Sequence, residues 1–165
     1  MQSQINVIPS PGRLSSPLHW RGCFAPAAEG GASATQLDKR DRILIVEDDL
    51  LIASQMEAAL TDAGFEVTGT ASTGKEALHL AETQSPTLVV MDIRLTGDRD
   101  GIDTALELFR SHGIRCIFAS AYSDQEARRR AAPANPLGWL QKPYTMASLT
   151  AVVRAALSEL RNRDV

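Results

Sequence analysis

The chain has 165 residues, enough for one ordinary domain with a single buried core, and its 44% hydrophobic and 22% charged residues are normal globular usage. The formal net charge is −3, but residues 1–40 hold four basic and two acidic groups, which leaves 13 basic and 18 acidic groups, a net of −5, in residues 41–165. An acidic domain repels nucleic-acid phosphates, so we expect no nucleic-acid partner.

The two cysteines, Cys23 and Cys116, lie in no CxxC motif or Cys/His cluster, which argues against a disulfide framework or a zinc site. Cys116 falls in an apolar run and is expected to pack as a small hydrophobic residue. No apolar run approaches the ~18 residues that a membrane-spanning helix needs. The first 40 residues lack the charged-then-apolar order of a secretory signal. We therefore expect a cytoplasmic protein with no membrane partner.

Residues 1–40 are rich in Pro, Ser, Gly and Ala and show no hydrophobic periodicity. This composition predicts a flexible N-terminal extension that cannot bury enough apolar surface to order itself. We interpret it as a disordered tail or the product of an upstream start codon. A docking or targeting tail around Leu18, Trp20 and Phe24 is the alternative.

From Asp41 onwards, short apolar runs alternate with helical patterns. In chain order the sequence predicts a strand over 43–46, a helix over 50–63, a strand over 65–70, a helix over 72–83, a strand over 87–91, a helix over 101–110, a strand over 114–120, a helix over 124–132, a strand over 137–140 and a final helix from Thr145. Gly64 and Gly113 end the first and third helices, and Ser72 or Thr73 caps the second. The first helix carries helically spaced residues at Leu51, Ser54 and Ala58.

Alternating strands and helices, with strands that are nearly uninterrupted apolar runs, predict a parallel sheet covered by helices on both faces. Ligands of such open sheets bind at the carboxyl ends of the strands. Carboxylates follow the first strand and end the third, a hydroxyl ends the fourth and a lysine follows the fifth: Glu47, Asp48, Asp49, Asp92, Ser120 and Lys142.

This set of side chains suits phosphoryl chemistry. Clustered acids repel one another, and a cation held by oxygen ligands, Mg²⁺ or Mn²⁺, would neutralise them. A carboxylate beside such a cation is a suitable nucleophile for a phosphoryl group. Lys142 would offer a positive charge to one phosphoryl oxygen, and Ser120 would donate a hydrogen bond to another.

Four segments resemble the receiver domains of bacterial two-component response regulators: ILIVEDD (43–49), LVVMDIRL (88–95), FASAY (118–122) and LQKP (140–143). The resemblance extends over about 41–160, and FASAY is similar to the Phe-Ala-Thr-Gly-aromatic segment of a subgroup of stand-alone receivers. It implies that 41–165 form a receiver domain with an α/β, flavodoxin-like doubly wound fold. The five parallel strands would have the order 2-1-3-4-5, with helices on both faces.

The resemblance also implies a role for each matching residue. Asp92 would be the phospho-acceptor, assisted by Lys142, which precedes an implied cis bond to Pro143, and by Ser120. The Mg²⁺ or Mn²⁺ ion would be held by Asp48, Asp92, Glu47 and the backbone carbonyl of Arg94. The switch that reports phosphorylation would comprise Ser120, Trp139 and Tyr122. For Trp139, the alternative is a tryptophan on a short edge strand that simply covers the core.

The function implied in this way is that of a single-domain response regulator rather than an enzyme, with only self-catalysed phosphotransfer and slow autodephosphorylation. A histidine kinase or histidine phosphotransfer protein would phosphorylate Asp92, and the added charge would draw Ser120 inward and let Trp139 follow. Since the chain ends soon after its last helix, no DNA-binding output domain is expected and output would pass to an unknown partner protein. The run 128–130 is interpreted as a solvated helix face, with partner docking as the alternative.

Three other functions compete with this one. A phosphohydrolase with an aspartyl intermediate would usually have a second Asp two residues after the nucleophile, where this chain has Arg94. A flavin carrier would need a phosphate-binding loop after the first strand, where the acids would repel a phosphate. The principal alternative is a constitutive, non-phosphorylated receiver-like binding module. Such modules typically lose the acceptor, a metal acid or the lysine, and this chain keeps Asp48, Asp92 and Lys142.

Overall fold

The computed structural model describes residues 41–121 and 125–163. The predicted extension over 1–40 and the predicted switch residue Tyr122 lie outside these ranges, and their roles stay predictions. No helix within the described ranges combines the length and the apolar character that crossing a membrane requires.

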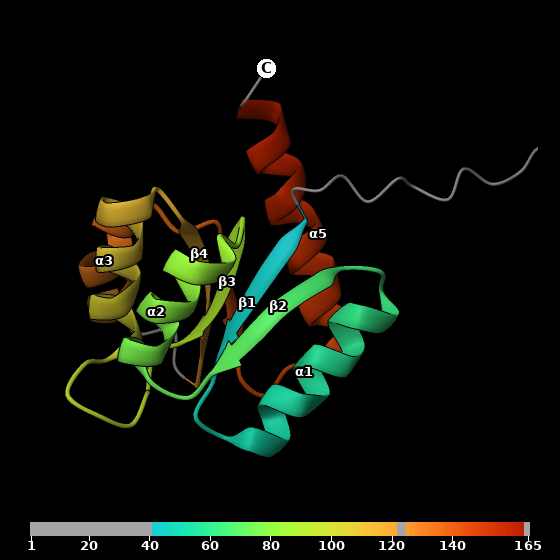
Figure 1. Cartoon of the computed structure of the whole chain (residues 1–165), viewed down its shortest axis with the longest axis horizontal. Coiled ribbons are helices and arrows are strands. Elements are labelled where there is room, and N and C mark those ends of the chain that lie inside the picture. The colour runs from blue at the N-terminus through green and yellow to red at the C-terminus, as the bar shows by residue number, and fades with distance from the viewer. Residues whose placement is uncertain (1–40, 122–124, 164–165) are drawn as a thin grey trace, which may run out of the picture. The chain divides into compact units, whose positions relative to one another are not determined.

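The described residues form one five-stranded sheet in which all neighbouring strands are parallel, in the order β2-β1-β3-β4-β5 (Figure 1). The predicted order 2-1-3-4-5 is therefore confirmed, and each predicted boundary lies within two residues of the observed one. The elements in chain order are β1 (Arg42–Val46), α1 (Leu50–Asp62), β2 (Glu66–Ala71), α2 (Gly74–Gln84), β3 (Leu88–Asp92), α3 (Gly101–His112), β4 (Arg115–Ser120), α4 (Gln125–Ala131), the 3-10 helix η1 (Ala132–Ala134), β5 (Gly138–Gln141) and α5 (Met146–Arg163).

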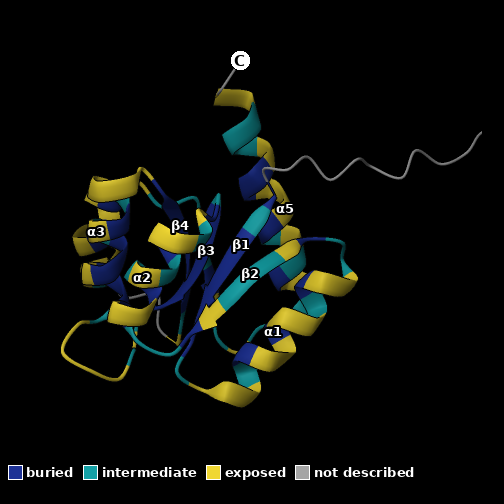
Figure 2. Ribbon diagram, in the orientation of Figure 1, coloured by how far each residue is buried: buried dark blue, intermediate teal, exposed yellow. Residues whose placement is uncertain are grey.

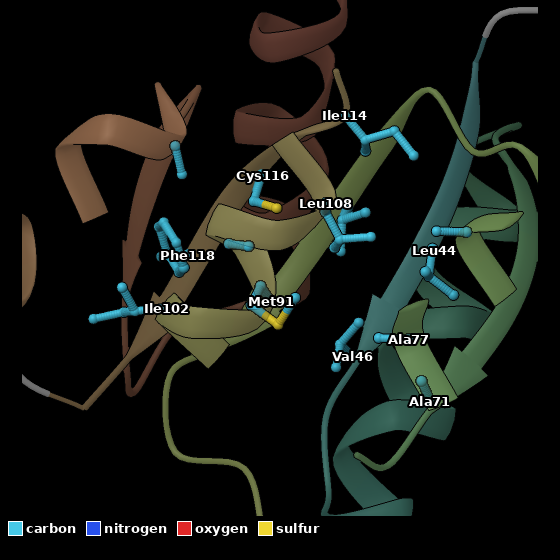
Figure 3. Close-up of a cluster of buried hydrophobic side chains, with 14 of the residues drawn as sticks. Leu44, Val46, Ala71, Ala77, Met91, Ile102, Leu108, Ile114, Cys116 and Phe118 are labelled. Carbon is cyan, nitrogen blue, oxygen red and sulfur yellow. The ribbon is translucent and has the colours of Figure 1, made fainter. Parts of the chain in front are cut away.

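Helices cover both faces of the sheet, with α1 and α5 on one face and α2 and α3 on the other (Figure 1). Successive residues of a strand point to opposite faces, so Leu44 and Val46 join the cluster under α2 and α3, while Ile43 and Ile45 join the cluster under α1 and α5. Figure 3 shows the first of these clusters, and Figure 2 shows the central strands buried between helices whose outer faces are exposed. The sheet interior is thus apolar on both sides, and polar groups gather at its edges.

Capping residues mark the ends of the helices, with side-chain caps where a helix starts and a glycine where α3 stops. Asp49 caps α1 and accepts hydrogen bonds from the backbone N–H groups of its first turn at 2.9 and 3.1 Å. Thr73, one of the two predicted caps, accepts from the N–H of Glu76 at 3.2 Å and begins α2. Gly113 ends α3 in the left-handed conformation, with φ of 68°. These caps fix where each helix starts or stops relative to its strand.

The helically spaced residues that the sequence shows in α1 do not form its buried face. Leu51, Ser54 and Ala58 are exposed, and Leu51 keeps 69% of its surface in contact with solvent. The buried face consists of Ala53, Met56 and Leu60. The helix carries apolar residues on both faces, so periodicity alone does not select the inner one. Its rotation follows from the Asp49 cap and the packing of Met56 and Leu60 against the sheet.

The start of α3 lies directly against the end of β3. The N–H of Gly101 donates a hydrogen bond to the carbonyl oxygen of Ile93 at 2.9 Å. A Cβ atom on Gly101 would overlap the backbone oxygen of Asp92, so only glycine allows this approach. The backbone of Asp92 is therefore held in place by the first residue of the following helix.

We predict that Gly101→Ala lowers the free energy of unfolding by about 1–3 kcal/mol, because the added methyl group must push the helix away from Asp92. Urea-induced unfolding followed by circular dichroism measures this change. Gly69→Ala is the matched control, since a Cβ there would lie 3.4 Å from Leu80, an ordinary contact distance. Its effect should stay below about 1 kcal/mol, and equal losses in the two variants would contradict the prediction.

We also predict that the thiol of Cys116 is unreactive in the folded protein. Cys116 is 1% exposed, and burial raises the pKa of its thiol to about 12, so hardly any thiolate is present near pH 8. In a Cys23→Ser background, a disulfide reagent at pH 8 should modify Cys116 more than about a hundredfold more slowly than in urea-unfolded chain. Similar rates of Cys116 modification in the folded and the urea-unfolded protein would refute the prediction.

Candidate functional site

The carboxyl ends of four strands meet at one edge of the sheet. The strand register pairs Val46 with Met91, Asp92 with Ala119, and Ser120 with Gln141. The residues that follow β1 and β5, together with the last residues of β3 and β4, therefore lie along the same edge. This is where the sequence predicted the polar constellation to gather.

Three of the predicted acids lie together. Glu47, Asp48 and Asp92 each offer a carboxylate oxygen, and these oxygens lie within 4.8 Å of one another. Glu47 and Asp92 are buried, whereas Asp48 is half-buried. Asp49, the fourth acid of the predicted constellation, uses its carboxylate to cap α1.

Lys142 joins two of these acids. Its Nζ atom lies 2.7 Å from Glu47 Oε2 and 2.8 Å from Asp92 Oδ2. Its backbone N–H donates to the carbonyl oxygen of Ser120 at 2.7 Å, which fixes the chain just beyond β5. The peptide bond from Lys142 to Pro143 is cis, as the resemblance implied. One side chain thereby links the ends of β1, β3 and β5.

Burial and charge shift the pKa values of the groups at this edge. Burial raises the pKa of the Glu47 carboxyl above its ordinary value, against the opposing hydrogen bond from Lys142, and the charge of Asp92 acts in the same direction as burial. Burial by itself would lower the pKa of Lys142, but the hydrogen bonds and charges of Asp92 and Glu47 outweigh it, and the pKa rises. The ammonium group is therefore charged at neutral pH.

The other predicted site residues, Arg94, Ser120 and Trp139, lie at different distances from the acidic cluster. Arg94 donates its backbone N–H to Asp92 Oδ1 at 3.2 Å, so the loop after β3 starts against the carboxylate. Ser120 ends β4 at the same edge and is half-buried. Trp139 packs into the cluster on the α2 and α3 side, where its ring centroid lies 4.9 Å from that of Phe118. The Arg128 guanidinium lies over the Trp139 ring at 4.7 Å, a contact that the sequence did not predict.

A pocket of about 440 Å³ borders the site, and its lining includes Lys142, Ile52 and Tyr144. Tyr144 is half-buried and donates a hydrogen bond from its hydroxyl to the Met56 sulfur at 3.5 Å. Sequence reasoning did not single out Tyr144, although its position directly after the Lys-Pro pair was a usable signal. A largely apolar pocket therefore lies directly beside the polar edge.

The residues present fit a hard divalent cation. Three carboxylates against one ammonium group leave two formal negative charges at the edge, and every metal ligand on offer is an oxygen. Carboxylate oxygens are the ligands that Mg²⁺ prefers in proteins. Glu47, Asp48 and Asp92 could therefore hold Mg²⁺, as the sequence predicted.

Comparisons with known proteins agree with the fold and with the acidic site described above. A family model described as the response regulator receiver domain matches residues 43–154. The transcriptional regulatory protein PdtaR of Mycobacterium tuberculosis is 35% identical over 120 residues, which are 73% of this chain and 58% of PdtaR. The phyllosphere-induced regulator PhyR of Methylorubrum extorquens is 33% identical over 121 residues, which are 73% of this chain and 45% of PhyR. The chain thus spans about half the length of these curated relatives.

A solved structure has the same fold. The CheY-like response regulator receiver domain protein of Methanospirillum hungatei superposes with a TM-score of 0.69 at 27% identity, over 74% of this chain and 98% of that one. With the sheet order, the acidic edge and the family match in agreement, the chain belongs to the response regulator receiver domain family of two-component systems.

Proposed function

We propose that this protein is a signalling switch in which Asp92 accepts a phosphoryl group from a histidine kinase or a histidine phosphotransfer protein. The observation that carries the proposal is the position of the buried Asp92 carboxylate, 2.8 Å from the Lys142 ammonium and beside two further acids that suit a divalent cation. Receiver domains are in general switches that bind Mg²⁺ at an acidic pocket, and this chain retains such a pocket.

In the proposed reaction, an Asp92 oxygen attacks the phosphorus of a phosphohistidine. The new O–P bond forms as the P–N bond breaks, and the imidazole leaves with the bonding electron pair and takes up a proton. Lys142 keeps its charge next to the acceptor and would contact one phosphoryl oxygen, while Ser120 would donate its hydroxyl hydrogen to another. Bound Mg²⁺ would offset the remaining negative charge of the phosphoryl oxygens. Hydrolysis of the acyl phosphate by water would reset the switch.

The phosphoryl group adds about −1.5 to −2 charges, and this charge would pull Ser120 towards it. Trp139 would follow and alter the surface that α4, β5 and α5 share. Output would pass through a protein partner rather than nucleic acid, because residues 41–165 carry a net charge of −5. We place this exchange in the cytoplasm, which is consistent with the receiver family.

One observation favours the alternative of a constitutive binding module. Trp139 is already held between the Phe118 ring and the Arg128 guanidinium, a packing that needs no phosphorylation. The two functions differ in whether Asp92 accepts a phosphoryl group and whether Trp139 responds to it, so the experiments below separate them.

We predict that intact-protein mass spectrometry detects one phosphoryl adduct after incubation with acetyl phosphate and Mg²⁺. Asp92→Asn should abolish the adduct because it removes the nucleophile, and EDTA should abolish it because it removes the cation. Asp98→Asn, which changes an exposed acid of the same loop, is the matched control and should label like the wild type. An adduct that survives in Asp92→Asn would refute the assignment. So would the failure of both acetyl phosphate and a phosphotransfer protein to label a chain that binds Mg²⁺.

We also predict that Ser120→Ala separates phosphorylation from switching. In a Trp20→Phe background, phosphorylation should change the fluorescence of Trp139. The Ser120→Ala variant should form the adduct about tenfold more slowly, since one hydrogen bond to the phosphoryl group is lost, and its fluorescence should stay constant. Ser120→Thr keeps the hydroxyl and should restore both signals. A normal fluorescence change in fully phosphorylated Ser120→Ala would show that Ser120 does not relay the signal.

A further inference from the structure

Helix α4 is attached to the domain by unusually little apolar surface. It has seven residues, of which only Ala131 is buried and Ala127 is half-buried. The three arginines in its last turns, Arg128, Arg129 and Arg130, are exposed. Burial of two alanine side chains stabilises a helix only weakly, so the polar contacts of α4 contribute much of what holds it in place.

One of these contacts joins α4 to α3. The Nη2 atom of Arg130 lies 2.7 Å from Asp100 Oδ2 and 3.4 Å from Asp103 Oδ1. Asp100 is also the N-cap of α3, because its other carboxylate oxygen accepts the N–H of Asp103 at 2.9 Å. Arg130 therefore holds α4 against the first turn of α3.

The neighbouring arginine makes no such bridge to α3. Arg129 pairs with Glu126, one turn earlier in α4 itself, so this contact holds α4 to nothing else. Of these two equally charged arginines on one short helix, Arg130 is paired with another element of the domain and Arg129 with its own helix.

Asp100 is coupled to Asp92 through the loop 93–100. At the start of this loop, the N–H of Arg94 donates to Asp92 Oδ1. At its end, Asp100 precedes Gly101, whose Cα packs directly on the backbone oxygen of Asp92. Both ends of the loop therefore lie against Asp92, the start against its carboxylate and the end against its backbone oxygen.

We propose that Arg130, Asp100 and Asp103 form an ionic latch that holds α4 against α3 in the unphosphorylated protein and opens when Asp92 is phosphorylated. The opening step rests on the function proposed above, whereas the closed latch does not. In this arrangement α4 receives the signal through the loop 93–100, a path separate from Ser120 and Trp139.

The closed latch is tested in the full chain without any phosphodonor. Hydrogen–deuterium exchange of the α4 amides should be about two- to fivefold faster in Arg130→Gln than in the wild type, as expected for the loss of an exposed ion pair that holds a marginal helix. Arg129→Gln is the matched control, because it removes the same charge from the same helix, and its α4 should exchange at close to the wild-type rate. Equal exchange in the two variants would overturn the latch.

Two further comparisons identify the partner of Arg130. Asp100→Asn keeps a side-chain cap for α3 but removes the charge, so it should accelerate exchange in α4 as Arg130→Gln does, and the double variant should show no further acceleration. At about 1 M NaCl, which weakens solvent-exposed ion pairs, wild-type exchange should move towards that of Arg130→Gln, which itself should change little. If Arg130→Gln and Asp100→Asn accelerated exchange in α4 additively, the proposed pairing of Arg130 with Asp100 would be overturned.

The opening step is tested by repeating the exchange with Mg²⁺ and acetyl phosphate while intact mass reports the phosphorylated fraction. Phosphorylation should raise exchange in wild-type α4 to about the level of Arg130→Gln and should affect that variant much less. An adduct without any change in wild-type α4 would overturn the opening step. Absence of an adduct would overturn the proposed phosphorylation, and the donor-free comparison would still decide whether the closed latch exists.

Discussion

The contact of the Lys142 ammonium with Glu47 and Asp92 is the interaction on which the functional edge depends. The parallel strand order forces the acids after β1 and at the end of β3 into proximity, where their charges repel one another. Both of these carboxylates are buried, and a buried charge is tolerated only when it is paired and hydrogen-bonded. Lys142 supplies that partner from just beyond β5, a strand that lies two positions away from β3 in the sheet, so the ion pairs also join the ends of β1 and β3 to the end of β5.

The apolar burial in the rest of the sheet offsets the free-energy cost of burying charged groups at this edge. Strand residues such as Ile43, Leu44, Val89 and Val90 are fully buried in the two apolar clusters, and they hold the strand ends in fixed register without help from the polar groups. Three carboxylates and one ammonium remain with a net negative charge, which makes the edge receptive to a cation but unfavourable to a free anion. This agrees with the acidic pocket at which receiver domains bind Mg²⁺.

The strand ends could be predicted from sequence because strict β/α alternation fixes which residues reach the carboxyl edge, whatever the details of packing. The side of α1 that faces the core could not, since Leu51 and Leu60 are equally apolar and only tertiary packing decides that Leu60 is buried. Asp49 belongs to the same acidic run of the sequence as Glu47 and Asp48, but in the structure it caps α1. The partners of Arg130 lie 27 and 30 residues away, beyond the reach of any local pattern.

Helices α3 and α4 differ in how they are held to the domain, and this difference has a mechanical consequence. Helix α3 buries Ile102, Ala105 and Leu108 and starts in direct contact with the Asp92 backbone, so it cannot shift without disturbing the core. Helix α4 buries only Ala131 fully, and it is otherwise held by the half-buried Ala127, the contact of Arg128 with Trp139 and exposed ion pairs, which are individually weak. A change at Asp92 that strains both helices will displace the one whose displacement costs least free energy. The elements that move in switching proteins are drawn from the least stable parts of the fold, and in this domain α4 is such a part.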